Sequence, residues 1–253
     1  MCFELDSLPP IPALSGGAPV RSEDLTLEAA DGTSFAAFAA VPDESGPVGV
    51  VVLPDVRGLY RFYEELALRF GERGYPTVAF DYFGRTAGVA KRDGDFPYME
   101  HVALTTPEGI QQDVRAAVEY LRSPFGGSCT TIFTVGFCFG GRNSWLATAG
   151  GHGLAGAVGF YGSTDERNGQ PGPTQRAGEF EAPILALQAG DDQNILPEHN
   201  AAFGAALTAA GVEHEIVVYD GAPHSFFDRK QAEFQSASDD AWQRTLAFIA
   251  QHA

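Results

Sequence analysis

The sequence predicts an α/β fold in which helices cover both faces of a mostly parallel central sheet. Apolar runs of strand length alternate along the chain with amphipathic stretches of helix length, as repeated strand–helix units require. The chain has 253 residues, 44% of them hydrophobic, so it can bury a large core. It contains no internal repeat and no linker long enough to divide domains. We therefore expect one domain over residues 1–253, with residues 1–20 as an irregular N-terminal arm.

The first third of the chain predicts a hairpin, two strands and a helix. Residues 24–42 are typical of an antiparallel hairpin, because two apolar stretches flank an Asp-Gly turn. The run VGVVVLP at 48–54 is the candidate for the first central strand. Apolar residues at helical spacing predict a helix over 60–74 that closes on its last residue, a glycine. YPTVAFD, at 75–81, is expected to return to the sheet as a strand.

The remainder of the chain continues this alternation. Residues 85–106 show no regular pattern, whereas 107–123 predict a helix, with a proline at its start and the apolar residues on one face. The polar, Gly- and Pro-rich residues 163–181 predict a loop. The other expected elements are strands at 131–136, 154–162, 182–190 and 213–221, and a closing helix over about 230–249.

The charge of the chain restricts its partners. Its 33 acidic and 16 basic residues give a formal net charge of -17, which repels nucleic acid and anionic membranes at long range. The segment 1–20 has neither a basic start nor a continuous apolar core, so neither a secretory signal nor a membrane anchor is expected. We expect a cytoplasmic protein that acts on a small molecule.

The three cysteines, Cys2, Cys129 and Cys138, form no CxxC pair. Their odd number and wide spacing argue against a disulfide framework and against a structural zinc site. Reduced thiols are therefore expected, and the chemistry described below needs no metal and no organic cofactor.

The stretch FTVGFCFGGRNSW, residues 133–145, is typical of a nucleophile elbow. Such an elbow holds its central residue on a strained turn between a strand and a helix, and small residues must stand where the backbone is crowded. Gly136, Gly140 and Gly141 occupy those places, and Cys138 is at the tip. The helix N-terminus favours the thiolate and can lower its pKa from the unperturbed value of ~8.5. The alternative is a buried cysteine that packs as a small apolar residue.

A nucleophile of this kind needs a base and an acid that orients the base. In elbow-type hydrolases the order along the chain is nucleophile, acid, histidine, with the last two on loops after later strands. His224, in YDGAPHSFFDR, occupies the loop that this order requires. Asp191 and Asp192 both follow the strand before it; we prefer Asp192, because the following turn should aim its carboxylate at the histidine, and Asp191 remains the alternative.

At these residues the sequence resembles the dienelactone hydrolases, or carboxymethylenebutenolidases, of the α/β-hydrolase superfamily. The resemblance spans roughly residues 30–250 and is carried by GFCFGG, the downstream aspartate and the PHSF histidine. It implies an α/β-hydrolase fold and a Cys-His-Asp triad formed by Cys138, His224 and Asp192.

The resemblance also implies roles for further residues. The family has an acidic residue, usually glutamate, that holds the resting thiol, and here the position is taken by Asp55. Its oxyanion hole of two backbone N–H groups implies Val56 and Phe139. The substrate carboxylate of the family meets two arginines. Arg85 matches the first, but at the second position, four residues after the histidine, this chain has Asp228, and Arg229 only follows it.

A cysteine nucleophile restricts the substrate class. A thiolate of pKa near ~8.5 leaves a tetrahedral intermediate far more readily than an alkoxide does, so ordinary alkyl esters mostly revert. A lactone whose ring oxygen departs as an enolate competes successfully. We therefore expect a hydrolase of activated lactones or enol and aryl esters, some of them carboxylate-bearing. The alternatives are a thiol-based redox sensor, although no resolving cysteine is near in sequence, and a non-catalytic protein that binds ligands in the same pocket.

Overall fold

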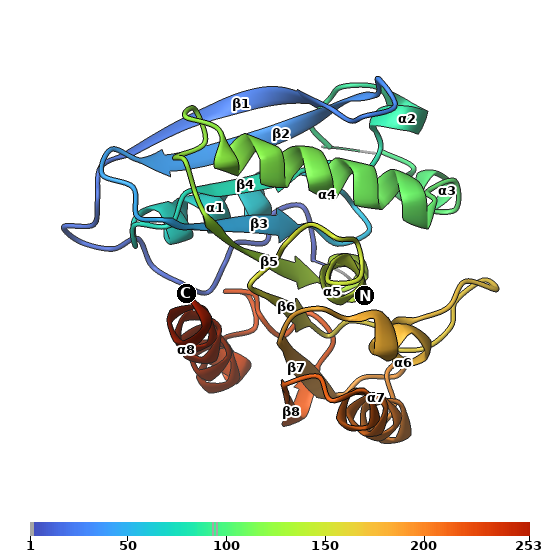
Figure 1. Ribbon diagram of the computed structural model, residues 1–253. Coiled ribbons are helices and arrows are strands. Elements are labelled where there is room, and N and C mark those ends of the chain that lie inside the picture. Colours follow the sequence, from blue (N-terminus) through green and yellow to red (C-terminus); the bar gives the residue numbers. More distant parts are fainter. Residues whose placement is uncertain (1–2, 93, 95) are drawn as a thin grey trace.

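The computed structural model describes residues 3–92, 94 and 96–253, and over these residues the chain forms one eight-stranded sheet (Figure 1). The strand order is β1-β2-β4-β3-β5-β6-β7-β8. β1 and β2 pair antiparallel, as do β2 and β4, and all other neighbours are parallel. The predicted mostly parallel sheet is thus confirmed. The strands are β1 (Val20–Glu28), β2 (Ser34–Pro42), β3 (Val48–Leu53), β4 (Thr77–Phe80), β5 (Thr131–Phe137), β6 (Gly156–Phe160), β7 (Ile184–Asp191) and β8 (His214–Pro223).

Helices pack on both faces of the sheet, also as predicted (Figure 1). On one face, α1 and α8 bury their apolar side chains against alternate residues of the central strands, and on the other face α4, α5 and α7 do the same. The central strands are covered on both sides, which explains their nearly continuous apolar sequences. The longer helices are α1 (Arg61–Gly71), α4 (Pro107–Arg122), α5 (Phe139–Ala147), α7 (Pro197–Ala210) and α8 (Gln235–His252).

Local sequence explains where several elements begin and end. The hairpin between β1 and β2 turns at Gly32, whose φ of 81° suits glycine. α4 begins after Thr106, whose side-chain oxygen accepts a hydrogen bond from the N–H of Gly109 at 3.1 Å. α1 ends at Gly71, three residues before the predicted end, and the chain completes the reversal through Gly74 at a φ of 87°. The helix was predicted too long because its final turn is not helical.

Four features of the structure differ from the sequence-based expectations or were missing from them. Two short helices, over residues 84–87 and 98–102, occupy parts of the segment 85–106, which shows no regular pattern in the sequence, and the predicted loop 163–181 contains another short helix and a 3-10 turn. α7 was not singled out, because few of its residues are buried and its amphipathic pattern is weak. The last helix begins at Gln235 rather than at 230, after a 3-10 turn. The short elements are α2 (Gly84–Ala87), α3 (Tyr98–Val102), α6 (Pro173–Arg176), η1 (Ala177–Glu179) and η2 (Ala232–Phe234).

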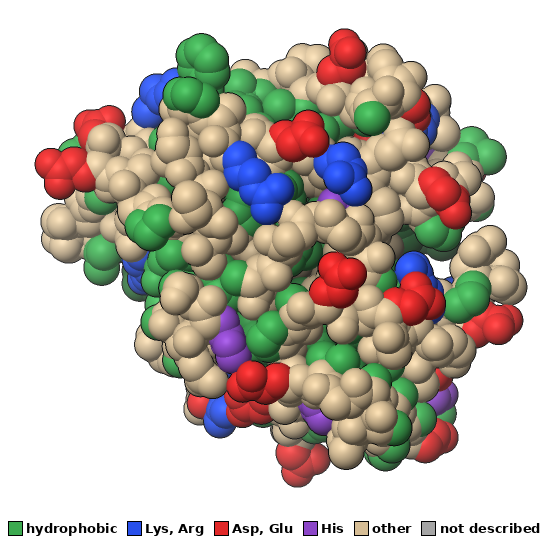
Figure 2. All heavy atoms as spheres, in the orientation of Figure 1, with side chains coloured by type: hydrophobic (Ala, Val, Ile, Leu, Met, Phe, Trp, Pro, Cys, Tyr) green, Lys and Arg blue, Asp and Glu red, His purple; other side chains and the backbone are tan. Residues whose placement is uncertain are grey.

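The surface reflects the composition of the chain. Acidic side chains are spread over the face shown in Figure 2 and outnumber the basic ones there, in keeping with the net charge of -17. Over the described residues, no helix is both long and apolar enough to cross a membrane.

Candidate active site

The elbow at the end of β5 has the geometry that its glycines predict. Cys138 lies between β5 and α5 with φ 55° and ψ -111°, a backbone conformation that residues other than glycine rarely adopt. A Cβ at Gly136 would lie 2.0 Å from the carbonyl oxygen of Gly140, and one at Gly141 would lie 2.7 Å from that of Phe160. The strained turn therefore exists because its neighbours have no side chains, and it presents a partly exposed thiol at the start of a helix.

The end of β3 lies directly beside this elbow. β3 and β5 pair in parallel, and Leu53 lies opposite Gly136. Asp55 is two residues beyond Leu53 and Cys138 is two residues beyond Gly136, so the two residues leave the sheet at the same level. A Cβ at Gly140 would lie only 2.0 Å from the carbonyl oxygen of Leu53, which shows how closely α5 meets this strand end. The register and the missing side chain bring the two segments together at the carboxyl edge of the sheet.

This packing also positions the two proposed oxyanion donors. Phe139 is the first residue of α5, so its N–H belongs to the helix turn that lacks intrahelical acceptors. Its ring packs edge-on against Tyr82, with ring centroids 5.2 Å apart, and the hydroxyl of Tyr82 donates a hydrogen bond to the carbonyl of Pro54 at 2.8 Å. Tyr82 thus ties the segment that leads to Val56 to the start of α5.

Asp55 is almost fully buried, with 1% of its surface exposed. One carboxylate oxygen accepts the N–H of Arg57 at 2.8 Å, and the other accepts the hydroxyl of Tyr60 at 3.2 Å. The N–H of Asp55 itself donates to the hydroxyl of Tyr63 at 2.9 Å. Two tyrosines at the start of α1 therefore hold Asp55, Tyr60 through its carboxylate and Tyr63 through its backbone N–H, and neither of them was identified from the sequence.

The acid and the histidine meet after β7 and β8. Asp192 Oδ2 lies 2.5 Å from His224 Nδ1, while Asp192 Oδ1 accepts the N–H groups of Asn194 and Ile195 at 2.8 and 3.2 Å. Burial alone would raise the pKa of Asp192, but the hydrogen bond and charge of His224 and the two N–H groups together lower it. Asp191, at the end of β7, is exposed instead. Of the two candidate acids, it is Asp192 that contacts the histidine.

Tyr161 connects the histidine to the elbow. Its ring centroid lies 4.9 Å from that of His224. The residue before it, Phe160, accepts the N–H of Cys138 through its carbonyl at 2.9 Å. Tyr161 is fully buried and has a φ of 36°. The segment Phe160–Tyr161 therefore contacts both the backbone of Cys138 and the ring of His224. The sequence did not identify it, because nothing around Tyr161 distinguishes it from the other residues that end strands.

The two arginines from the resemblance lie elsewhere. Arg85 makes two hydrogen bonds to Asp113, of 2.7 and 2.8 Å, and one to Asp31 of 2.9 Å. Asp113 is 1% exposed, and burial raises its pKa to about 7 even though Arg85 acts in the opposite direction. Arg229 is exposed at the surface. Neither guanidinium group has a described contact with Asp192 or His224.

The other cysteines differ from Cys138. Cys129 is buried in the core, and burial raises the pKa of its thiol to about 11, so it is a poor nucleophile at neutral pH. Cys2 lies outside the described residues. Among the described side chains, no group of three or more His, Cys, Asp or Glu residues is arranged to hold a metal ion.

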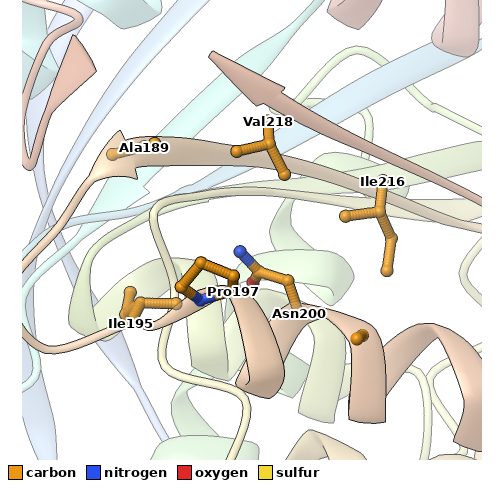
Figure 3. Close-up of a pocket in the computed structure, with 8 residues that line it drawn as sticks. Ala189, Ile195, Pro197, Asn200, Ile216 and Val218 are labelled. Atoms are coloured by element: carbon orange, nitrogen blue, oxygen red, sulfur yellow. The ribbon is translucent and has the colours of Figure 1, made fainter. Parts of the chain in front are cut away.

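An apolar hollow of about 310 Å³ opens between α7 and the ends of β7 and β8 (Figure 3). Ile216 and Val218 of β8 face Pro197 and Asn200 of α7 across it. Asn200 is engaged through its side-chain oxygen, which accepts a hydrogen bond from Gln188 at 2.9 Å. None of the candidate catalytic residues lines this hollow, so it is separate from the elbow.

Comparison with known proteins gives the family of this chain. A sequence model described as "Dienelactone hydrolase family" matches residues 35–253, which include the elbow, Asp192 and His224. The chain belongs to the dienelactone hydrolase family. The resemblance stated from the GFCFGG and PHSF motifs is therefore confirmed, and so is the α/β-hydrolase fold.

Individual relatives agree with this family. A protein of Escherichia coli assigned as a carboxymethylenebutenolidase is 31% identical over 229 residues, which cover 87% of this chain and 84% of that protein. A crystal structure assigned as a dienelactone hydrolase of Klebsiella pneumoniae superimposes with a TM-score of 0.80 at 26% identity, covering 92% of this chain and 99% of the other. A Bradyrhizobium protein assigned as a 2-oxo-3-(5-oxofuran-2-ylidene)propanoate lactonase is 25% identical over 232 residues, 88% of this chain and 91% of that protein.

Proposed function

We propose that this chain is a hydrolase that opens an activated lactone, or cleaves an enol or aryl ester, through a covalent acyl-enzyme on Cys138. The observation that carries the proposal is the 2.5 Å contact between Asp192 and His224, on the loops that follow β7 and β8 at the same edge of the sheet as the cysteine elbow. Family membership supports hydrolysis as the reaction. The names of the relatives given above support a lactone as the substrate.

In the proposed first step, the Cys138 thiolate attacks the carbonyl carbon and the carbonyl oxygen becomes an oxyanion. The N–H groups of Val56 and Phe139 would stabilise that oxyanion, since helix N-termini and preorganised backbone donors favour developing negative charge. The bond between the carbonyl carbon and the ring oxygen then breaks, and the ring oxygen leaves as an enolate that takes a proton from His224. The product of this step is a thioester on Cys138.

In the second step, water attacks the thioester and transfers its proton to the neutral imidazole of His224. The thiolate leaves, the acid product departs, and the proton returns to the Cys138–His224 pair. Asp192 would keep the imidazole in one orientation and stabilise its charged form, a role that its lowered pKa allows, because the carboxylate stays ionised at neutral pH.

The chemistry of the thiol explains why activated substrates are favoured. Reversal of the first step competes with ring opening, and an enolate or a phenolate leaves much more readily than a simple alkoxide. We expect measurable turnover of aryl acetates and of unsaturated lactones, and little turnover of ethyl esters.

Replacement of the nucleophile tests the proposal. We expect Cys138→Ala to abolish the hydrolysis of an aryl acetate and Cys138→Ser to retain a small residual rate, with Cys129→Ala as the matched control that keeps the wild-type rate. Mass spectrometry of the rapidly quenched wild-type protein should detect the acyl group on the peptide that contains Cys138. Wild-type turnover by Cys138→Ala would rule out this mechanism.

A further inference from the structure

The N-terminal arm packs between the strand that leads to the nucleophile and the catalytic histidine. Phe3 is 2% exposed, and its ring stacks on that of Phe62 with the centroids 3.9 Å apart. The same ring lies 6.2 Å from the rings of Phe137 and Tyr161. Phe137 directly precedes Cys138, and Tyr161 contacts His224. The side chain of Phe3 is therefore buried beside the site, whereas Glu4, Leu5 and Asp6 are exposed.

Hydrogen bonds attach the arm to the segment that follows His224. The N–H of Arg229 donates to the carbonyl of Leu8 at 3.0 Å, and the N–H of Leu8 donates to Asp228 at 3.4 Å. Lys230 and Asp6 form an ion pair of 2.6 Å. The family model matches only from residue 35 onward, so the arm lies outside the part of the chain that defines the family.

The arm and the acid–histidine loops enclose a cavity of about 290 Å³. Phe3 and Glu4 of the arm line this cavity together with Asp192 and His224. Within the described part of the chain, no lysine or arginine contributes to the lining. The remaining lining residues are Asp191, Gln193, Asn194, Pro223, Ser225, Asp228 and Gln231.

The cavity is acidic as a consequence. Asp192 is compensated by His224, but none of the described ion pairs includes Glu4, Asp191 or Asp228. Asp228 stands where the resemblance places the second carboxylate-binding arginine, and its carboxylate accepts N–H groups of the chain instead. Lys230 attracts Glu4 and Asp228 electrostatically but is itself paired with Asp6, so carboxylates still outnumber cations around the cavity. This excess of negative charge raises the free energy of an anion that enters there.

We propose that Phe3 and Glu4, held in place by the contacts of the arm, form a fixed wall of the cavity beside His224 in which the substrate lies. This wall selects small uncharged lactones or aryl esters over carboxylate-bearing ones. Phe3 limits the size of the group that lies against His224, and Glu4, with Asp191 and Asp228, disfavours negative charge there. The inference rests on the proposed function, because selection requires a reaction at Cys138. It assigns to this chain a substrate class that differs in charge from the propanoate in the name of the Bradyrhizobium relative.

Alkylation of Cys138 tests the charge of the wall and needs no turnover. In a Cys2→Ser background, the rates with neutral iodoacetamide and with anionic iodoacetate are measured and normalised to those of free mercaptoethanol. We expect Glu4→Gln to raise the relative rate of iodoacetate about threefold at low salt, and less at high salt, where the charges are screened. Glu44→Gln, an exposed acid before the amino end of β3, is the control. If the ratio of the iodoacetate rate to the iodoacetamide rate were equal in the wild type and both variants, the inference that Glu4 disfavours anions would be wrong.

Hydrolysis tests the substrate class. para-Acetoxybenzoate and its methyl ester are compared, each normalised to its reaction with mercaptoethanol, because their leaving groups differ in pKa. We expect kcat/KM to favour the methyl ester by about tenfold at low ionic strength, and Glu4→Gln to narrow that preference. A preference for the carboxylate would overturn the inference. If Cys138→Ala cleaved both esters at the wild-type rate, the proposed function would be wrong. The alkylation ratios would still show whether Glu4 disfavours an anion near Cys138.

The size limit is tested at Phe3. We expect Phe3→Ala to raise kcat/KM for naphthyl acetate relative to phenyl acetate about fivefold, whereas Leu14→Ala, which removes an exposed leucine from the same arm, should leave the ratio unchanged. Circular dichroism checks folding, and Phe3→Leu, which keeps an apolar side chain but removes the flat ring, replaces Phe3→Ala if that variant does not fold. Unaltered selectivity in a folded variant would overturn the role of Phe3.

Discussion

Removal of Arg85 should cost stability in a pH-dependent way and should leave substrate recognition unchanged. Arg85 contacts Asp113 through two hydrogen bonds of 2.7 and 2.8 Å, and Asp113 is 1% exposed. Arg85→Met would leave that carboxyl group buried without its cation. The loss of one partner of a buried ion pair costs about 3–5 kcal/mol, and we expect about 2–4 kcal/mol here because Arg85 is partly exposed.

The dependence on pH follows from the raised pKa of Asp113. Burial raises it to about 7 from the ordinary 3.8 even in the presence of Arg85, so Asp113 stabilises the fold below pH 3.8 and loses that contribution as the pH rises toward 7. Without Arg85 the pKa of the folded state rises further. The variant should therefore lose little at about pH 5, where the carboxyl group is protonated in both folded proteins. It should lose about 1.4 kcal/mol at about pH 8, and the full amount only above its own raised pKa.

Urea unfolding followed by circular dichroism at both pH values measures this difference. Thermal unfolding at pH 8 should show a melting temperature that is lower by about 3–6 °C. Arg61→Met is the control, since Arg61 forms an exposed pair with Glu65 that is worth about 0.5 kcal/mol or less. Asp113→Asn in the Arg85→Met background should remove the pH dependence. Unchanged stability, together with a tenfold rise in KM for carboxylate-bearing substrates alone, would refute this reasoning and assign Arg85 to substrate binding.

Three further predictions concern the acid, the thiol and a buried histidine. Asp192→Asn should lower kcat about 10²–10⁴-fold because the amide cannot stabilise the charged imidazole, whereas Asp191→Asn should change kcat less than about threefold; steady-state kinetics on an aryl acetate compares them. Asp55→Asn should shift the pH profile of Cys138 alkylation by iodoacetamide, and superimposable profiles would remove that carboxylate from thiol activation. Burial lowers the pKa of His152 to about 4 from 6.5, so the free energy of unfolding should fall by up to about 3 kcal/mol as the pH drops through this interval, and His152→Gln should flatten that slope in urea titrations.

The sequence was sufficient for the elbow because local sterics determine it. Gly136, Gly140 and Gly141 stand at fixed offsets from Cys138, and each is required where another backbone segment passes within about 3 Å of the position of a Cβ. The long helices and central strands were predictable for a similar reason, since their apolar spacing matches the period of the element. The order of nucleophile, acid and histidine along the chain located the loop of His224.

What the sequence left open was decided by contacts between distant segments. Asp191 and Asp192 are adjacent and chemically identical, and only the packing of β7 beside β8 determines which carboxylate faces His224. Tyr161 carries no local signal, because its importance comes from its place between two loops that are far apart in sequence.

Tertiary structure also determined the partners of the charged residues and of the arm. The family motif could assign Arg85 a position but could not show that Asp113, from another helix, contacts its guanidinium. The arm has no periodicity, so the sequence predicted only an irregular segment, and Phe3 is buried because the aromatic rings around Phe62 offer it a surface. Side-chain spacing and backbone sterics act over a few residues and can be read from the sequence. Pairing of charges and burial of an irregular segment depend on which surfaces the fold brings together.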